Sequence, residues 1–236
     1  MGSVGKPVEY TKFKGELETT GFLRGRAFKG DGSDVNQFFR DSTNNYDLIA
    51  EASMDNAAID AFNSWAVGDF MDGQQYDGWD NMDREWQEKT RIYDSYLDRS
   101  VINKNFETRR LASAELLLGG GNYNITEQQL KELMNRTEPF LVKANMSTSA
   151  APSGLQIGWG SHPVEYVFRF PKGSVGAGMW IGDSRINDEW DNRQREFMTN
   201  RDSLFKLEGY KRNEKKGVWE VTMKWVGGAE HDYGRE

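Results

Sequence analysis

Three short groups of residues in the second half of the chain carry side chains that could work together. Arg110 can hold an anion, the hydroxyls of Ser147-Thr148-Ser149 can orient a neighbour, and Glu196, with Gln194 beside it, can stabilise positive charge. Separations of 37 and 49 residues (147 − 110 and 196 − 147) divide them. Alone, each group is more often a loop, a strand face or a surface charge, so the prediction rests on their conjunction.

The local sequence around these groups suits β-strands. Gln194 and Glu196 are two residues apart, so in an extended segment both side chains point to the same side. Ser147 and Ser149 share a face for the same reason. We therefore expect both groups on strands that lie beside the arginine.

Helices are predicted before these strands. Apolar residues at helical spacing predict helices over Ala57–Phe70 and from about Met82 to Ile102. Thr126 and Gln129 form a capping box that begins a short helix ending near Arg136. Phe106–Leu118 starts as a strand, and its second half, from Leu111, fits either a helix or a strand.

Strand patterns dominate after Pro139. The predicted strands are Phe140–Ala144, Glu165–Phe170, Gly178–Ile181, Glu196–Thr199, Leu204–Lys211 and Val218–Val226, of which the last two form a hairpin. Helices followed by strands indicate an α+β fold rather than alternating βαβ units. We expect residues 1–50 to form an arm or small hairpin and 51–236 one domain, with a helical part at 51–105 and a β core at 106–236.

Composition excludes several kinds of site. The net charge of −7 argues against nonspecific binding to nucleic acid, and no run approaches the ~20 apolar residues of a membrane span. The absence of cysteine excludes disulfides and thiolate chemistry, and two separated histidines, His162 and His231, argue against a metal site. The first residues lack the apolar segment of a signal peptide. We expect the protein to act in the cytoplasm of a cell. A chain of this composition also suits a protein that a virion or a secretion system delivers into that cell.

The stretch from about Tyr93 to Val226 resembles the mono-ADP-ribosyltransferases of the Arg–Ser–Glu class, of the bacterial toxin and bacteriophage type. The resemblance rests on an arginine on a strand after a helix, a Ser-Thr-Ser that begins a strand, and a Gln-x-Glu that leads into another. Residues 168–181 are similar to the family's strand–Pro–x–Gly–strand unit, and residues 194–207 to its catalytic strand, turn and next strand.

This resemblance implies a split β-sandwich preceded by helices, with NAD as substrate and no metal. It implies that Arg110 binds the NAD phosphates, that Ser147, with Thr148 and Ser149, belongs to the NAD site, and that Ser147 positions the catalytic Glu196. By the same resemblance the segment 150–161 lies over nicotinamide, where Trp159 could stack. The implied reaction transfers ADP-ribose to a side chain of a protein in a host or competing cell, with Gln194 orienting the acceptor.

Two departures from the family pattern leave questions open. The family shows an aromatic residue, then arginine, then glycine, whereas here Arg109-Arg110-Leu111 leaves the choice between two arginines; we prefer Arg110. Arg24-Gly25 fits that local pattern better but lies far before Ser147, and no suitable helix precedes it. In the family, enzymes that modify arginine usually have glutamate at the position that Gln194 occupies here. We therefore expect an acceptor other than arginine.

Two other functions remain compatible with the sequence. One is hydrolysis of NAD, with water as the acceptor. The other is a catalytically silent structural protein, for example a virion component, because a fold alone does not guarantee its chemistry.

Overall fold

The computed structural model describes residues 8–12, 16–19, 26–29, 38–39, 42–64, 79–150, 155–156, 162–181, 196–228, 230–231 and 233. Helices with defined bounds are α2 (Asn45–Ala52), α3 (Asn56–Ser64), the 3₁₀ helix η2 (Trp79–Asn81), α5 (Arg84–Leu97), α6 (Glu115–Leu118) and α7 (Glu127–Met134). Strands are β1 (Glu16–Thr19), β2 (Arg26–Lys29), β3 (Phe106–Ala112), β4 (Phe140–Val142), β5 (Met146–Ser149), β6 (Leu155–Gln156), β7 (Val164–Phe170), β8 (Gly178–Trp180), β9 (Glu196–Thr199), β10 (Ser203–Asn213) and β11 (Val218–Gly228).

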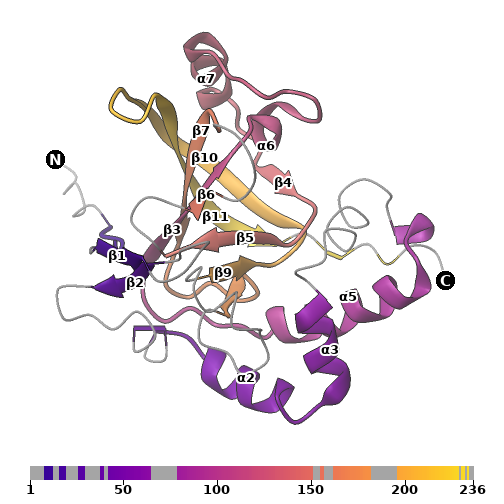
Figure 1. Ribbon diagram of the computed structural model, residues 1–236. Helices are drawn as coiled ribbons and strands as arrows, with labels where there is room; N and C mark the ends of the chain where they lie inside the picture. The colour runs from indigo at the N-terminus through magenta and orange to yellow at the C-terminus, as the bar shows by residue number, and fades with distance from the viewer. Residues whose placement is uncertain are drawn as a thin grey trace, which may run out of the picture.

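The main sheet divides into two halves at β3. Its strand order is β4-β10-β11-β7-β3-β5-β9-β8, with β6 also paired to β3 (Figure 1). Seven residue pairs join β3 to β7, whereas the only pair between β3 and β5 is Arg109 with Ser149. This narrow junction lets the two halves turn away from each other, as the predicted split β-sandwich requires, and it lies where Arg110 and Ser147-Thr148-Ser149 were expected to meet.

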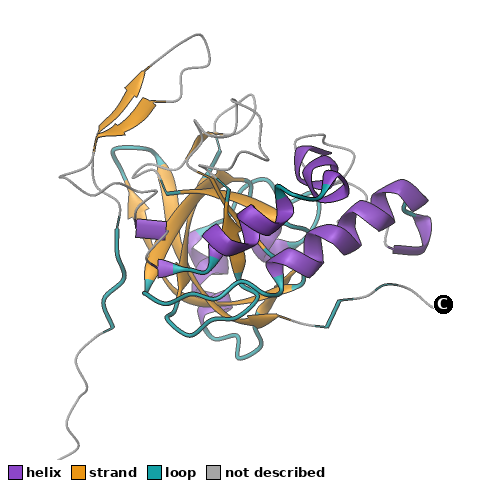
Figure 2. Ribbon diagram, turned by 90° about the horizontal axis from the view of Figure 1, so that it is seen from below, coloured by secondary structure: helices purple, strands orange, loops and turns teal. Residues whose placement is uncertain are grey.

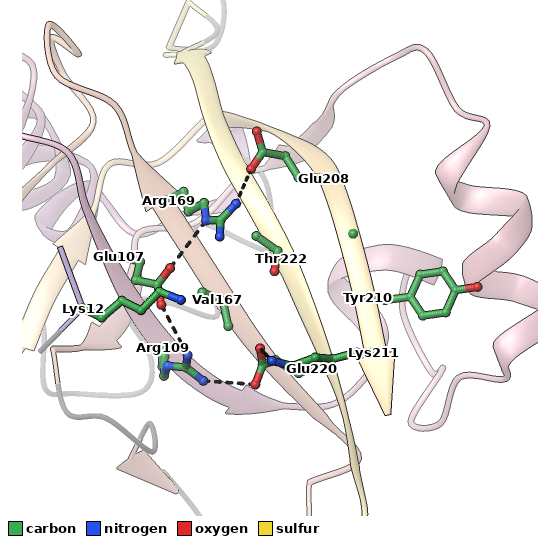
Figure 3. A pocket seen from close by; sticks show the side chains of 11 residues that line it. Lys12, Glu107, Arg109, Val167, Arg169, Glu208, Tyr210, Lys211, Glu220 and Thr222 are labelled. Atoms are coloured by element: carbon green, nitrogen blue, oxygen red, sulfur yellow. Dashed lines mark hydrogen bonds and ion pairs between the residues drawn. The ribbon is translucent and has the colours of Figure 1, made fainter. Parts of the chain in front are cut away.

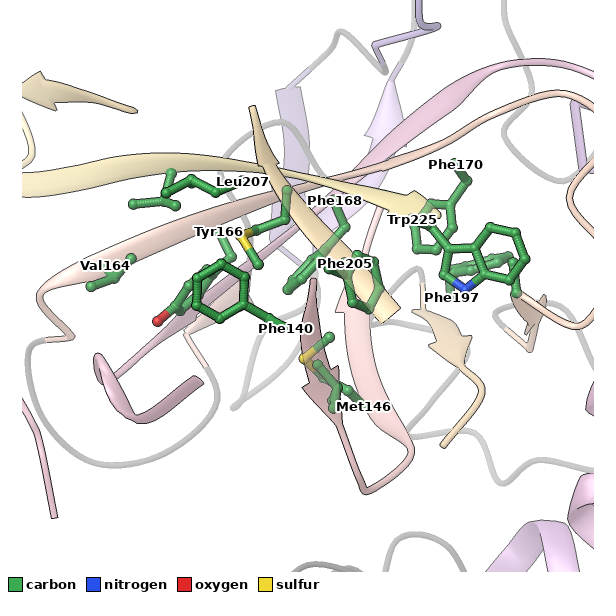
Figure 4. Packing of buried hydrophobic residues seen from close by; sticks show 14 of the residues in the cluster. Phe140, Met146, Val164, Tyr166, Phe168, Phe170, Phe197, Phe205, Leu207 and Trp225 are labelled. Carbon is green, nitrogen blue, oxygen red and sulfur yellow. The ribbon is translucent and has the colours of Figure 1, made fainter. Parts of the chain in front are cut away.

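Aromatic side chains from both halves of the sheet form the main core. Phe168, Phe170, Phe197 and Phe205 are fully buried and pack edge to face or tilted against one another (Figure 4), and the equally buried Phe106 packs against Phe170 and Phe197. Burial of one such ring stabilises the fold by about 1.5–3 kcal/mol. Phe197 comes directly after Glu196, so this core fixes the strand that carries the candidate catalytic carboxylate.

Helices α2, α3 and α5 lie together against the smaller half (Figure 2). A second buried cluster joins Leu48, Phe62 and Tyr93 of these helices to Met179 of β8 and Met198 of β9. The strand β9 is therefore held by apolar contacts on both sides, through Phe197 on one and Met198 on the other. None of the helices that the structure describes is long and apolar enough to cross a membrane.

The predicted α+β order is confirmed, and several elements fall where the sequence placed them. Strand β9 begins at Glu196 and ends at Thr199 as predicted, and Thr126 and Gln129 form the capping box at the start of α7. The hairpin of β10 and β11 is also present. In the ambiguous stretch from Phe106, the chain forms strand β3 and then the short helix α6.

The predicted end of the long helix is wrong. Helix α5 ends at Leu97 rather than at Ile102, and its last turn is closed by a hydrogen bond from the Ser100 amide to the Leu97 carbonyl. Val101 and Ile102 then form isolated β-bridges to Val175 and Thr43. Ile102 is fully buried in this extended conformation, so its apolar character does not need a helix.

The first fifty residues contain more structure than the predicted arm. Strands β1 and β2 pair antiparallel, and Thr11 bridges to Phe106 at the start of β3. Helix α2 (Asn45–Ala52) runs across residue 50, so the helical part begins before residue 51. The sequence did not predict helix α2 because the segment is short and begins with the polar Asn44-Asn45. Its few apolar residues do not give a clear helical period.

Candidate active site

Three strands bring the predicted site residues into one neighbourhood. Strand β5 pairs antiparallel with β9, and Ser149 lies directly opposite Glu196, while Ser147 lies opposite Met198. Arg109 of β3 pairs with Ser149 on the other side of β5. Side chains of directly opposed residues point to the same face with Cβ atoms about 4.5–5.5 Å apart. In this register the serine directly opposite Glu196 is Ser149. The sequence favoured Ser147 as the residue that positions Glu196.

Arg110 reaches across the junction to β5. Its Nη1 donates a hydrogen bond of 2.8 Å to the carbonyl oxygen of Ser147. Burial lowers the pKa of the Arg110 guanidinium, and electrostatic interaction, chiefly with Glu196, acts in the opposite direction. Arginine remains protonated in proteins, so a positive charge lies here beside the strand that carries Glu196. Within the part of the chain that the structure describes, Arg110 forms no ion pair.

Arg109 is turned to the opposite side of β3. Its guanidinium lies 3.3 Å from Glu107 and 3.4 Å from Glu220 (Figure 3), and 3.5 Å from Glu165. Glu107 also pairs with Arg169, which in turn pairs with Glu208. Arg109 is therefore part of an ion-pair network on the outer face of β3, β7, β11 and β10. The backbone register places Arg109 beside Ser149, whereas the Arg110 guanidinium bonds to the Ser147 backbone carbonyl and is influenced by the charge of Glu196.

Thr148 joins three strands from the opposite face of β5. The Thr108 hydroxyl donates to Thr148 Oγ1 at 2.7 Å, and the Thr148 hydroxyl donates to the Phe197 carbonyl, also at 2.7 Å. All three residues are buried. Thr148 thus holds β3, β5 and β9 in register rather than pointing toward Glu196. The sequence did not single out Thr108, although it lies two residues before Arg110 and therefore on the same strand face.

The backbone around Glu196 is closely packed. Glu196 is only 2% exposed. Gly178 of β8 has φ +145°, and a Cβ there would lie 2.1 Å from the Met198 carbonyl oxygen, so only glycine lets β8 approach β9 this closely. Asn145 donates its side-chain amide to the Thr199 carbonyl at 3.2 Å. The carboxylate is thus placed on a strand whose neighbours leave it little freedom.

A cavity of about 690 Å³ adjoins Arg110. Its walls come from the end of β3, from α6 and the glycines after it, and from the connection between β4 and β5. Arg110, Tyr166, Glu115, Lys143 and Asn145 are its principal polar lining residues. The Tyr166 hydroxyl donates to the Ser113 carbonyl at 2.8 Å, and burial raises its pKa, so it stays neutral. The cavity thus has positive charge at Arg110 and Lys143, a carboxylate at Glu115, and small or apolar residues over much of the remaining wall.

Three residues discussed from the sequence lie outside the described residues: Gln194, Trp159 and Arg24. Their roles remain predictions. Among the described residues, no group of three or more acidic or histidine side chains could hold a metal ion.

Comparison of the sequence with protein-family models gives no match, and a search of curated proteins gives none either. Comparison of the structure with solved structures does. The fold matches Plx2a, an ADP-ribosyltransferase toxin from Paenibacillus larvae, with a TM-score of 0.64, 13% identity and coverage of 82% of this chain and 95% of that one.

Two further matches are to structures solved with nicotinamide dinucleotides. C3stau2 from S. aureus with NAD has a TM-score of 0.63 and 14% identity, with 92% of this chain and 100% of that chain covered. BECa, an ADP-ribosylating toxin of a binary enterotoxin of C. perfringens solved with NADH, has a TM-score of 0.60 and 14% identity, with 81% of this chain and 48% of that chain covered. The chain therefore has the fold of the ADP-ribosyltransferase toxins, as the sequence predicted.

Proposed function

We propose that this protein transfers ADP-ribose from NAD to a side chain of a target protein and releases nicotinamide. The observation that carries the proposal is the junction of β3, β5 and β9 on this fold, where the partly buried Arg110 bonds to the Ser147 carbonyl and feels the charge of Glu196, and where Ser149 lies opposite Glu196 in the strand register. NAD has an anionic diphosphate and a ribose that becomes positive during cleavage. The residues present suit both parts of that molecule.

Arg110 would hold the diphosphate. A partly buried guanidinium that forms no ion pair among the described residues carries a desolvation cost, and an anionic ligand would reduce that cost. The adjoining cavity of about 690 Å³ is large enough for an adenosine group. Its small lining residues Gly119, Gly120 and Ala144 would let a flat base approach the backbone. Trp159 and the segment 150–161 are proposed to cover the nicotinamide end.

Glu196 would be the catalytic carboxylate. The bond between ribose C1′ and the nicotinamide nitrogen breaks with its electron pair leaving on nicotinamide, and the ribose gains oxocarbenium character. A fixed carboxylate beside the ribose stabilises this positive charge and holds the 2′-hydroxyl. A lone pair of the acceptor atom then forms the new bond to C1′, and the acceptor gives up a proton. Ser149, opposite Glu196, and Ser147 would orient the carboxylate.

Gln194 would orient the acceptor. An amide donates and accepts hydrogen bonds without charge, so it suits a neutral acceptor side chain better than a guanidinium. We therefore propose a non-arginine acceptor on a protein of a host or competing cell. The protein would act in the cytoplasm of that cell after delivery by a virion or a secretion system.

The test is incubation of the purified protein with labelled NAD and lysates of bacterial and eukaryotic cells, with Glu196→Gln as the control. Label on a lysate protein that is absent with the control supports the proposal, and mass spectrometry of that protein identifies the acceptor. Release of nicotinamide without protein label indicates hydrolysis of NAD. If NAD is neither consumed nor bound, the chain is catalytically silent and the proposal is wrong.

A further inference from the structure

Lys143 is the second cation that lines the cavity beside Arg110. Among the described lining residues, the only carboxylate is that of Glu115, which already accepts hydrogen bonds from the Ser113 hydroxyl at 3.3 Å and from the Gly121 amide at 3.0 Å. Glu115 is thus occupied in holding the glycine loop after α6. Two positive charges and one engaged negative charge give the cavity a surplus of positive charge, which favours an anionic ligand.

The backbone at Lys143 is fixed, while its side chain is exposed. The Lys143 carbonyl accepts a hydrogen bond of 3.4 Å from the Asp202 amide, and Asn145 bonds to Thr199, so the connection between β4 and β5 is held against the turn after β9. In the described part of the chain Lys143 forms no ion pair, whereas Lys89 and Lys216 do. A fixed backbone with an uncommitted ammonium group is suited to a ligand's charge rather than to internal pairing.

We infer that Lys143 binds the adenosine-side phosphate of the NAD diphosphate, while Arg110 binds the phosphate nearer to Glu196. This inference rests on the proposed function, and it adds a binding residue that the sequence motifs do not contain. A diphosphate carries one negative charge on each phosphate, and Arg110 supplies only one positive charge. The remaining lining near Lys143 includes Leu141, Ala144 and Leu116, which are apolar or small, so the charge of Lys143 stands next to walls that suit the adenosine group.

Calorimetric titration with ADP-ribose tests the inference, because ADP-ribose keeps both phosphates and is not consumed. At low ionic strength Lys143→Ala should weaken ADP-ribose binding about 3- to 10-fold, as expected for one partly exposed charged contact. Lys143→Arg should keep most of the affinity. The difference in affinity between Lys143→Ala and the wild type should shrink in 0.5 M salt. The screening length at that concentration lies between the values of about 10 Å at 0.1 M and about 3 Å at 1 M, so the charge of Lys143 is largely screened. Lys215→Ala, at the exposed turn between β10 and β11, is the matched control for the loss of one positive charge.

Nicotinamide mononucleotide, which lacks the adenosine-side phosphate, locates the contact. Its affinity should be the same for Lys143→Ala and the wild type. Equal ADP-ribose affinity of Lys143→Ala and wild type, or an equal loss with nicotinamide mononucleotide, would overturn the inference while leaving the proposed function intact. If the wild type binds neither NAD nor ADP-ribose, the proposed function itself is wrong, and the inference falls with it.

Discussion

Arg109 and Arg110 are neighbours on β3, yet their guanidinium groups lie in opposite kinds of surroundings. Arg109 contacts three carboxylates on the outer face of the sheet, whereas Arg110 bonds to the neutral Ser147 carbonyl and lines a cavity. The charge of Arg109 is balanced by ion pairs, whereas Arg110 forms no ion pair among the described residues, and we propose that its charge binds a ligand. Residue type therefore does not distinguish the two arginines. The face of β3 on which each side chain lies, and the number of carboxylates near it, do.

The largest effect on turnover should come from substitution of the proposed catalytic carboxylate, Glu196. Glu196→Gln removes the negative charge while keeping the size of a buried side chain, so we expect turnover to fall about 10²–10³-fold because one preorganised electrostatic contact is lost. Nicotinamide release under single-turnover conditions measures this, and the melting temperature checks that the variant is folded. Near-normal turnover would remove Glu196 from the mechanism.

Arg110→Ala should act on binding. Loss of a buried, charge-assisted contact to a phosphate should raise the Kd for NAD about 10- to 100-fold. The unfolding free energy should change less than for Arg109→Ala, because Arg110 forms no ion pair among the described residues. Titration calorimetry gives the affinity and urea unfolding the stability. An unchanged Kd with a large loss of stability would mean that Arg110, too, is structural.

Arg109→Ala should show the reverse pattern. Glu107 and Glu165 are 3% and 0% exposed and would lose a positive partner, so we expect unfolding to become about 2–3 kcal/mol easier. The loss stays below that of a fully isolated charge because Lys216 still pairs with Glu165 at 2.8 Å. At a temperature where the variant is folded, its NAD affinity should be close to that of the wild type. A selective loss of affinity would exchange the roles of the two arginines.

The sequence predicted which residues lie on strands better than it predicted how those strands pair. Motif order and strand alternation placed Arg110, Ser147 and Glu196 on strands, and β9 has the predicted bounds, because alternation and burial are local signals. Pairing register is not local, so the sequence favoured Ser147 where the register puts Ser149 opposite Glu196. The same limit hid Thr108 and Lys143, whose relevance depends on strands and loops distant in the chain. Helix α5 was extended too far because Ile102 is buried without being helical.

Ser149→Ala and Ser147→Ala sharpen the register. A hydroxyl that orients a catalytic carboxylate typically contributes roughly 10- to 100-fold. We expect Ser149→Ala to lower kcat about tenfold with little change in the KM for NAD, and Ser147→Ala to have the smaller effect. Steady-state kinetics of the two variants decide between them. A larger loss for Ser147→Ala would restore the order that the sequence suggested.

The smallest effect concerns a second ion-pair cluster, after β9. Arg201 pairs with Asp94 of α5 and with Asp202, and His231 bonds to Asp98 at 2.9 Å and to Asp202 at 3.0 Å. Burial lowers the pKa of His231, but the hydrogen bonds to Asp202 and Asp98 outweigh it and raise the pKa to about 9. Like the Arg109 network, this cluster serves structure, since it ties α5 to the turn that follows the strand of Glu196.

Because the folded-state pKa of His231 lies above its unfolded value, its contribution is complete below about pH 6.5 and is lost as the pH rises through about 9. We expect about 1–2 kcal/mol of stability to disappear over that range after screening by solvent. Urea unfolding between pH 6 and pH 10 measures it. His231→Gln should flatten the profile, and an equally steep decline in that variant would assign the effect to another group.

The most direct test of the account is a crystal structure of the Glu196→Gln variant with NAD, in which the substrate is bound but cleaved slowly. We predict that the diphosphate lies against the Arg110 guanidinium, that the adenosine group enters the cavity beside it, and that the nicotinamide ribose lies at residue 196. NAD bound to the outer face beside Arg109, or bound without contact to Arg110 and residue 196, would contradict it.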